Sequence, residues 1–343
     1  MRVLIVRLSS FGDVVHTFPA VSDLVAARPD IEIDWLVDES FSEIAGLHPA
    51  IGEVIGFAER RNRWPPGRWP AYLKARRQLR NRLRARSYDL VVDLQGLMKS
   101  TLVARLGAAP ITGYDPKSIR EPIASRFYGR KISVAKNLHA VERNRALLSS
   151  AIGYDIGAAA GTFGIAIDQS QIPAGLTEPY CMFFHSASWP SKLWSEDNWR
   201  ALVTHLAAGQ IKIVLPWGND EEKKRAERIA AENNRVLVMP YRLEGAELAT
   251  AIGGARCVIG LDTGLMHLAT ALGVPGIWLF GPTDPGLTGP YGPNQTIVSS
   301  TNPNAPCRTR DCAHGPGGRT CMDMIDLDRL AEVLDAQLAN ARS

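Results

Sequence analysis

The sequence predicts an α/β protein made of two parallel-sheet domains. Apolar strands alternate with helical patterns along nearly the whole chain, and 343 residues are enough for two domains with separate cores. The strand–helix pattern also restarts after a stretch rich in glycine, alanine and short polar residues, 153–179. We therefore expect domains at 1–165 and 172–322, and a C-terminal helix at 325–343 that packs back on the first domain.

Strand predictions rest on short apolar runs, and helix predictions on apolar residues spaced three or four apart. In the first half, these patterns predict strands at 3–6, 31–37, 54–57, 88–94 and 111–114, and helices at 14–25, 72–86, 99–106 and 139–150. In the second half, they predict strands at 164–167, 181–184, 211–215, 236–239, 257–259 and 276–280, and helices that begin near 197, 221, 246, 263 and 327. Because strands and helices alternate, each sheet should be parallel and covered by helices.

The composition is that of a globular protein, with 45% apolar and 22% charged residues. No uncharged apolar run is long enough to span a membrane, and the chain starts with an apolar strand instead of a signal peptide. We therefore expect the protein in the cytoplasm.

One segment carries much of the positive charge. Between Arg60 and Arg86 there are eleven Lys or Arg residues and no acid, although the net charge of the whole chain is only +4. The segment starts with a proline-braced loop flanked by Trp64 and Trp69, where clustered guanidinium groups suit bidentate capture of phosphate or carboxylate. The tryptophans suit a membrane interface. The basic face of the helix that follows, 72–86, is alternatively an ordinary face in contact with solvent and without a partner. Nucleic acid, membrane lipid and a phosphorylated substrate are all open as the anionic partner.

The five cysteines do not have the pattern of a disulfide framework. Cys181 and Cys257 lie in apolar strands, as core thiols do. The other three are spaced too loosely for the paired knuckles of a zinc ribbon. They are Cys307, Cys312 and Cys321, with His314 nearby. We expect loop thiols here, and no metal site.

The loop after the first strand carries polar residues where α/β proteins place their ligands. It contains Ser10, Gly12 and Asp13, at the carboxyl end of the strand. Neither a G-x-G-x-x-G fingerprint nor a P-loop is present, so hydride-transfer cofactors and P-loop chemistry lose support. A carboxylate at this place can accept a proton from a hydroxyl nucleophile. Alternatively, Asp13 is only the cap of the next helix, which Pro19 opens late or kinks.

Residues 260–273 form a second candidate site, with the pattern of strand end, turn and helix. At such a helix start, Thr263, Gly264 and His267 can surround a phosphate, because unpaired N–H groups and the helix dipole favour an anion. Asp262 or Thr263 is alternatively only a cap of an ordinary helix. The expected buried stripe consists of Leu265, Leu268, Ala269 and Leu272, and the expected polar face of Thr263, His267 and Thr270.

Two further residues are weaker candidates. Lys192 follows a serine-rich turn and is able to meet a phosphate as a point charge, although a single Lys before a helix means little. Glu222 lies in a first helical turn, where acids are expected because of the helix dipole alone. Binding of a ribose hydroxyl by Glu222 is the alternative.

Several motifs give a more specific indication. Two α/β halves without dinucleotide or P-loop glycines suggest the GT-B architecture of nucleotide-sugar transferases. The motifs resemble the lipopolysaccharide heptosyltransferases of glycosyltransferase family 9, those of type I in particular. They are residues 9–20 (SSFGDVVHTFPA), 93–100 (DLQGLMKS), 120–122 (REP), 139–143 (HAVER), 215–218 (LPWG), 262–267 (DTGLMH) and 281–285 (GPTDP).

The resemblance implies two facing Rossmann-like domains, the first for the acceptor and the second for the nucleotide sugar. It further implies that heptose moves from ADP-heptose to a Kdo residue of Kdo-lipid A in the lipopolysaccharide inner core, with inversion and without a metal or cofactor. The acceptor places such a protein at the cytoplasmic face of the inner membrane, as a peripheral protein.

The same resemblance implies roles for individual residues. Asp13 matches the catalytic base, and Lys192 the residue that stabilises the departing diphosphate. The implied contacts to the donor diphosphate are Ser188, Lys192, Thr263 and Gly264. Asp262 and His267 are implied at the donor sugar and Glu222 at the ribose. Trp217 is a further implied donor contact. The implied acceptor contacts are Ser10, Gly12, Arg60, Arg61, Arg63 and Arg120.

Three alternatives stay open. A type II heptosyltransferase or another core transferase of the family would differ in its acceptor. A GT-B nucleotide-sugar epimerase would share the diphosphate site but use no acceptor, which leaves the basic segment unexplained. A nucleic-acid binding module would use the basic segment, but the chain has no recognisable nucleic-acid motif, so we expect no nucleic-acid partner.

Overall fold

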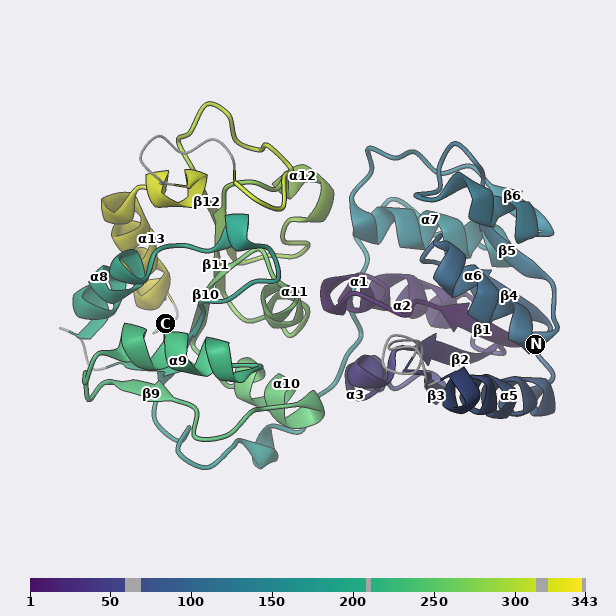
Figure 1. Cartoon of the computed structure of the whole chain (residues 1–343), viewed down its shortest axis with the longest axis horizontal. Helices are drawn as coiled ribbons and strands as arrows, with labels where there is room; N and C mark the ends of the chain where they lie inside the picture. Colours follow the sequence, from purple (N-terminus) through teal and green to yellow (C-terminus); the bar gives the residue numbers. More distant parts are fainter. Residues whose placement is uncertain (59–68, 208–210, 313–319, 341–343) are drawn as a thin grey trace. The chain divides into compact units, whose positions relative to one another are not determined.

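The computed structural model describes residues 1–58, 69–207, 211–312 and 320–340. The chain divides into two compact units, Met1–Ala166 and Ile167–Ser343, and each contains a six-stranded sheet (Figure 1). Every strand pair in both sheets is parallel, which confirms the predicted fold class. No helix among the described residues combines the length and the apolar character that crossing a bilayer requires.

The first unit has the strand order β3-β2-β1-β4-β5-β6. Its elements are β1 (Arg2–Val6), α1 (Phe11–Val15), α2 (Phe18–Ala27), β2 (Glu32–Val37), η1 (Glu39–Phe41), α3 (Ser42–Ala45), β3 (Ile51–Gly56), α5 (Trp69–Arg86), β4 (Leu90–Asp93), α6 (Met98–Ala104), η2 (Arg105–Gly107), β5 (Ile111–Tyr114), η3 (Pro122–Phe127), β6 (Arg130–Ile132) and α7 (Ala140–Ile152). Helix α2 packs beside α7, and α5 packs beside η2 at the end of α6. The order reverses at β1 and β4, so the loops after these two strands meet at the edge where such folds bind ligands.

The first unit differs from the sequence-based expectation, most clearly at a divided helix, an added strand and a missing strand. The helix predicted at 14–25 is two helices, because Pro19 lies in the first turn of α2 and interrupts the chain of backbone hydrogen bonds. Strand β6 was not predicted. The strand predicted at 164–167 does not form; Gly164 has a φ of +62°, and the Ala166 N–H donates to the Leu47 carbonyl 3.1 Å away. This segment is therefore a connector that lies along the first unit.

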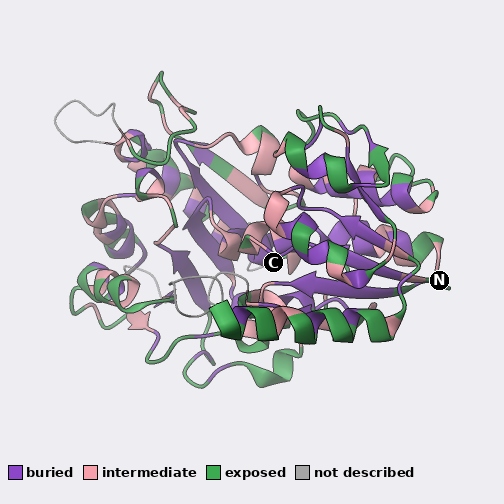
Figure 2. Ribbon diagram, turned by 45° about the vertical axis from the view of Figure 1, so that its right-hand side comes forward, coloured by how far each residue is buried: buried purple, intermediate pink, exposed green. Residues whose placement is uncertain are grey.

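The second unit has the strand order β12-β11-β10-β7-β8-β9. Its elements are η4 (Gln169–Gln171), β7 (Tyr180–Phe184), η5 (Pro190–Lys192), α8 (Glu196–Ala207), β8 (Lys212–Leu215), α9 (Asp220–Ala230), β9 (Val236–Val238), α10 (Gly245–Gly253), β10 (Cys257–Leu261), α11 (Gly264–Ala271), β11 (Gly276–Phe280), α12 (Pro285–Thr288), β12 (Gln295–Ser299), η7 (Cys321–Met324) and α13 (Leu327–Asn340). Strand β12 was not predicted. The central strands β7 and β10 of the second sheet are buried along their whole length, and β1 and β4 of the first sheet are buried except at their first residue; buried segments are purple in Figure 2.

The C-terminal helix belongs to the second unit. Its apolar side chains Leu330, Leu334 and Leu338 are buried in a cluster with residues of β7, β8 and α8, including Trp199. Our expectation that this helix packs back on the first domain is therefore corrected. The spacing of the three leucines predicted an amphipathic helix but did not indicate which core the apolar face covers.

Candidate functional site

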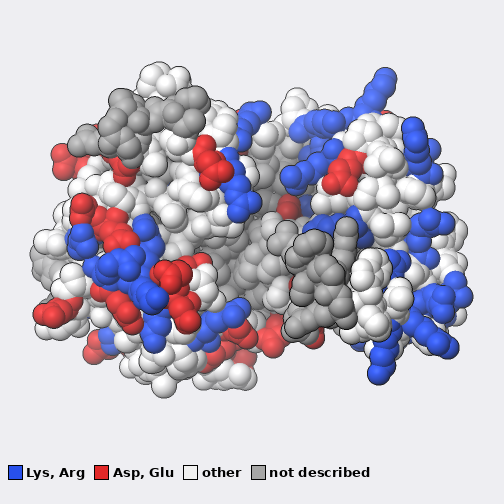
Figure 3. All heavy atoms as spheres, viewed as in Figure 1, with Lys and Arg blue, Asp and Glu red and all other residues white. Residues whose placement is uncertain are grey.

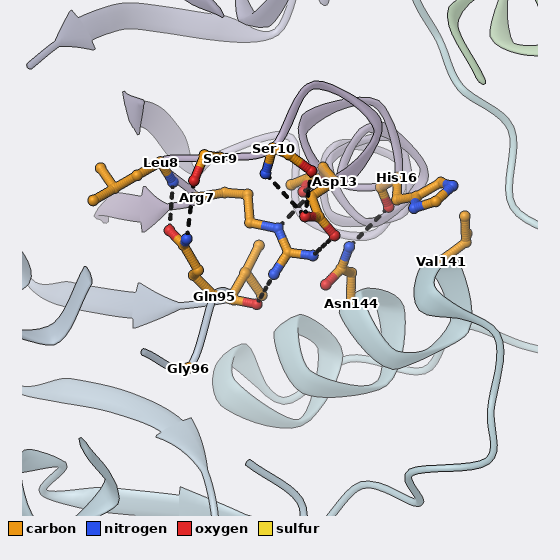
Figure 4. A network of polar contacts seen from close by, with 12 residues as sticks. Arg7, Leu8, Ser9, Ser10, Asp13, His16, Gln95, Gly96, Val141 and Asn144 are labelled. Atoms are coloured by element: carbon orange, nitrogen blue, oxygen red, sulfur yellow. Dashed lines mark hydrogen bonds and ion pairs between the residues drawn. The ribbon is translucent and has the colours of Figure 1, made fainter. Parts of the chain in front are cut away.

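The carboxylate of Asp13 lies at the N-terminus of α1, held by the loop that leaves β1 (Figure 4). The Ser10 amide N–H donates to Oδ2 of Asp13 over 2.9 Å, and the Ser10 hydroxyl lies 3.0 Å from the same oxygen. This is the capping-box arrangement, in which the third helical residue reaches back to the cap residue. The side chain of Asp13 nevertheless remains 39% exposed. The cap residue is therefore Ser10 and not Asp13, as the structural alternative had it; Asp13 supports the helix start from the third position, and its carboxylate stays accessible.

Arg7 is a partner of Asp13 that the sequence did not reveal. Its guanidinium is 10% exposed, and Nη2 donates to Oδ1 of Asp13 over 3.0 Å. Nη1 donates to the backbone carbonyl of Leu94, so the arginine ties the loop after β1 to the end of β4. The signal available in the sequence was a charged residue directly after a fully buried strand, Arg7 after Val6. Arg7 therefore orients the Asp13 carboxylate through a charge-assisted hydrogen bond.

The loop after β4 approaches the same place. Oε1 of Gln95 accepts from the Leu8 amide over 2.8 Å, and its Nε2 donates to the Ser9 hydroxyl over 3.3 Å. Nζ of Lys99, in the first turn of α6, donates to the same hydroxyl over 2.7 Å. A lysine and an amide therefore join Asp13 at one edge of the sheet, from the motif at residues 93–100.

A buried carboxylate supports this second loop. Asp93 is fully buried, and it accepts hydrogen bonds from the amides of Gln95 and Gly96 at 3.0 and 3.1 Å. The hydroxyls of Ser100 and Tyr128 donate to its other oxygen at 2.9 and 2.8 Å. Burial raises the pKa of Asp93 despite these donors. Its contacts are all internal, so Asp93 shapes the loop and does not face a ligand.

The expected acceptor residues are only partly described. Ser10 and Gly12 lie in the loop and first turn of α1 beside Asp13, and Arg120 is exposed two residues before η3. Glu121, next to Arg120, accepts from the Met98 amide over 2.7 Å, which ties this segment to the start of α6. Arg60, Arg61 and Arg63 lie outside the described residues.

The second unit contains a buried ion pair. Nζ of Lys192, in η5, lies 2.6 Å from Oδ2 of Asp262 and 3.0 Å from its backbone carbonyl, and both side chains are nearly buried. The Lys192 ammonium also lies 5.1 Å from the ring centroid of Trp189. Burial by itself would raise the pKa of Asp262, but the neighbouring His267 and the charge of Lys192 outweigh it and hold the pKa well below its usual value. The Asp262 carboxylate is therefore ionised at neutral pH.

Helix α11 begins directly after this pair. Thr263 is its cap residue and has extended backbone angles, but within the described residues its hydroxyl makes no capping hydrogen bond. Thr263 and Gly264 are both partly exposed, so the first N–H groups of the helix are accessible. Nε2 of His267 lies 3.6 Å from Oδ1 of Asp262. The structure thus brings together Lys192, Asp262, Thr263, Gly264 and His267 at one helix N-terminus.

Two residues of the expected polar face of α11, His267 and Thr270, are buried, whereas Thr263 is partly exposed. The His267 ring packs 4.8 Å from that of Trp278, and the Thr270 hydroxyl donates to Oε1 of Gln295 over 3.1 Å. Trp278 donates to the same amide oxygen over 2.9 Å. The prediction that the apolar stripe is buried is wrong at its two ends, since Leu265 and Leu272 are partly exposed. Gln295 comes from the unpredicted strand β12, which supplies the polar partner that allows this face to be buried.

The remaining expected donor residues lie at the ends of β7 and β8. Ser188 is exposed in the loop after β7. Trp217 is half-buried and donates to the Met239 carbonyl over 2.7 Å, and Nζ of Lys223 lies 5.2 Å from the centroid of its ring. Oε2 of Glu222 accepts from the Gly218 amide over 2.7 Å. Glu222 therefore has a local structural role at the start of α9, the role that the helix dipole predicts.

Among residues 1–58, 69–207, 211–312 and 320–340, no three His, Cys, Asp or Glu side chains are grouped so that they could hold a metal ion. Cys181 and Cys257 are buried core thiols, as predicted. Cys321 is buried as well, and burial raises its pKa to about 11. His314 lies outside the described residues.

Comparison with known proteins gives a consistent picture. Residues 76–316 match glycosyltransferase family 9 (heptosyltransferase). The lipopolysaccharide heptosyltransferase 1 of Pseudomonas aeruginosa is 44% identical, over 98% of this chain and 98% of that protein. The solved structure of the E. coli heptosyltransferase WaaC with ADP has a TM-score of 0.85 at 37% identity, and covers 98% of this chain and 100% of that chain. The structure of WaaC with ADP-2-deoxy-2-fluoro heptose has a TM-score of 0.82 at 37% identity, covering 98% and 99%. The GT-B architecture expected from the sequence is thereby confirmed.

Proposed function

This chain belongs to glycosyltransferase family 9, the heptosyltransferases, and we propose that it transfers L-glycero-D-manno-heptose from ADP-heptose to a Kdo residue of Kdo-lipid A. The observation that carries the proposal is the Lys192–Asp262 pair at the start of α11, in a chain 44% identical to a heptosyltransferase of type 1. We assign acceptor binding to the first unit and donor binding to the second. The reaction adds the first heptose of the lipopolysaccharide inner core.

In this proposal Asp13 is the general base. A Kdo hydroxyl attacks the anomeric carbon of the heptose, and its proton passes to the Asp13 carboxylate as the new C–O bond forms. The bond between the anomeric carbon and the diphosphate breaks at the same time, so the configuration inverts. Arg7 holds the Asp13 carboxylate in one orientation through its hydrogen bond to Oδ1, and a base must be positioned in this way before each turnover.

The leaving ADP gains negative charge as the glycosidic bond breaks. The Lys192 ammonium and the N-terminus of α11, at Thr263 and Gly264, are the positive groups that we assign to this charge. Asp262 holds Lys192 in place, and with His267 it lies where the donor sugar is expected. We propose that these groups suffice and that the reaction needs no metal ion or other cofactor.

The other donor contacts follow the same assignment. Trp217 and Ser188 lie at strand ends of the second sheet, and we place them at the nucleotide and the diphosphate. Glu222 contacts the ribose in this proposal. Its Oε2 accepts a hydrogen bond from the Gly218 amide, and an ionised carboxylate has acceptor sites for more than one donor, such as a ribose hydroxyl.

The acceptor carries the carboxylate of Kdo and the phosphates of lipid A, so it requires cationic partners. We assign this role to Arg60, Arg61, Arg63 and Arg120, with Ser10 and Gly12 beside the base. Because lipid A is anchored in a bilayer, we propose that the protein works in the cytoplasm as a peripheral protein on the inner membrane.

The test is detection of the product by mass spectrometry. The full chain is mixed with ADP-heptose and either Kdo-lipid A or an acceptor that already carries one heptose. We expect a single heptose on the first acceptor only. Transfer to the second acceptor alone would instead assign the type II reaction, and isomerisation of a free nucleotide sugar without any acceptor would assign an epimerase.

A further inference from the structure

We propose that the first unit docks on an anionic bilayer through one surface, formed by α5, the end of α6 with η2, and η3. This inference rests on the proposed function, because a lipid-anchored acceptor requires the enzyme to approach a membrane. It goes further by assigning the contact to particular side chains. We call this the docking surface, and its apolar members are Trp69, Leu73, Leu102, Ile123 and Phe127.

These five apolar side chains are unusually exposed. Their exposed fractions range from 38% for Phe127 to 58% for Leu73. Single exposed apolar residues are common on proteins, but several large ones on neighbouring elements mark a contact surface. Trp69 and Leu73 are four residues apart on α5 and therefore lie on one face of that helix.

Direct contacts join the three elements into one surface. Nη2 of Arg76 on α5 donates to the Leu102 carbonyl on α6 over 3.3 Å. The guanidinium of Arg105, one turn after Leu102, lies 5.1 Å from the ring centroid of Phe127 on η3. The exposed apolar residues are thus linked through arginines that lie between them, and do not occupy separate places on the unit.

The charge of this surface complements an anionic membrane. Helix α5 contains no acidic residue, and Figure 3 shows Lys and Arg side chains spread over the first unit. Two of its arginines, Arg82 and Arg86, are neutralised by Glu53 and Asp34. The exposed basic residues outside those pairs are Lys74, Arg77, Arg80, Arg84, Arg105 and Arg126. Basic residues of this kind are attracted to an anionic leaflet when they lie near its surface.

The docking surface is continuous with the loop that carries Asp13. Lys99 and Leu102 are three residues apart on α6, and Lys99 contacts Ser9 in that loop. Arg120 lies two residues before η3, which carries Ile123 and Phe127. An acceptor whose acyl chains lie in the bilayer would therefore present its sugar close to the proposed base.

A membrane explains these observations better than a nucleic acid does. A nucleic-acid surface requires basic residues, and its aromatic residues stack on bases. It gives no reason for exposed aliphatic residues such as Leu73, Leu102 and Ile123. Amphipathic membrane-surface segments combine both classes, with apolar side chains entering the headgroup boundary and basic ones facing anionic lipids.

The test measures sedimentation of the full chain with vesicles of phosphatidylcholine alone or of phosphatidylcholine with phosphatidylglycerol. We expect binding to the anionic vesicles, weakened about tenfold or more by the double change Leu73→Ser and Phe127→Ser, and also by Arg77→Gln with Arg80→Gln. The control is Met324→Ser, which removes a similarly exposed apolar side chain from the second unit and should bind like the parent. Thermal unfolding checks that all variants are folded.

Activity separates this inference from the proposed function. The Leu73→Ser, Phe127→Ser variant should keep its turnover on a water-soluble acceptor without acyl chains, and lose turnover on Kdo-lipid A embedded in vesicles. If the parent transfers heptose to neither acceptor but vesicle binding depends on these residues, the proposed function fails and the docking surface stands. If the serine variant binds anionic vesicles as the parent does, or if the parent binds a generic oligonucleotide but no vesicles, the docking surface is refuted.

Discussion

Replacing Asp13 with Asn tests the assignment of the base and separates it from the structural role of the same side chain. Asn keeps an oxygen that accepts the Ser10 N–H, but it cannot take a proton and no longer neutralises Arg7. Loss of a general base lowers kcat by about 10²–10⁴-fold. We expect that loss, with an unchanged Kd for ADP, since the proposed donor contacts all come from the second unit.

The structural loss can be bounded. A helix-capping side chain contributes ~1 kcal/mol, and a hydrogen bond to a charged group about 1.5–3 kcal/mol, so the variant loses at most about 4 kcal/mol. Even a protein with only about 5 kcal/mol of stability would then remain more than about four-fifths folded. Unfolding therefore explains less than about a twofold fall in rate, far less than the loss expected from removing the base.

Asp23→Asn is the matched control. Asp23 is a carboxylate of the same unit that pairs with the buried Arg145 over 2.6 Å, and we assign it no role in the reaction. Initial rates from mass spectrometry, ADP affinity from calorimetry and urea unfolding are measured for both variants. A kcat for Asp13→Asn within tenfold of the parent, or an equal loss in Asp23→Asn, would remove Asp13 as the base.

Three other predictions concern the second unit. Lys192→Gln leaves the buried Asp262 carboxylate without its cation, so it should lower the free energy of unfolding by about 3 kcal/mol, measured by urea unfolding. Adding Asp262→Asn in a double variant should restore most of this loss, and a double variant without restoration would show that the pair is not coupled. Burial, aided by a nearby arginine, lowers the pKa of His185 to about 4, so unfolding raises its proton affinity. The contribution of the neutral His185 ring to the free energy of unfolding is therefore complete above the usual histidine pKa of about 6.5, and it falls by about 3 kcal/mol as the pH is lowered to 4. Urea unfolding at several pH values should show a smaller loss of stability at low pH in His185→Gln than in the parent. Leu334→Ala should lower stability by about 2–5 kcal/mol in thermal unfolding, because Leu334 is fully buried in the second core; a loss below 1 kcal/mol would contradict that packing.

Elements bounded by strong local signals could be predicted to the residue. Strands β5 and β11 have the predicted ends, since a proline directly precedes each of them and marks where the strand begins. Strands β6 and β12 were missed because they lie at sheet edges, where partly exposed residues leave no apolar run to recognise. Their assignment depends on pairing with a neighbouring strand, which a single sequence does not state.

The candidate residues followed from local pattern and resemblance, but their partners did not. Arg7 contacts the Leu94 carbonyl across 87 positions of sequence, and Gln295 contacts Thr270 across 25. Such contacts arise from strand order, so they become visible only after the sheet is assembled. For the same reason, the buried polar side of α11 was misjudged: helical periodicity places His267 on a face but does not say that Trp278 covers it.

The Lys192–Asp262 pair also bears on how the enzyme would finish a turnover. A lysine that binds a diphosphate and has no other anion nearby loses its only counter-ion when the nucleotide departs, and this favours retention of the product. The Lys192 ammonium lies 2.6 Å from the Asp262 carboxylate, which pairs with it again when the nucleotide has left. In the proposed function this carboxylate competes with ADP for the same ammonium, so it weakens product inhibition and speeds regeneration of the free enzyme.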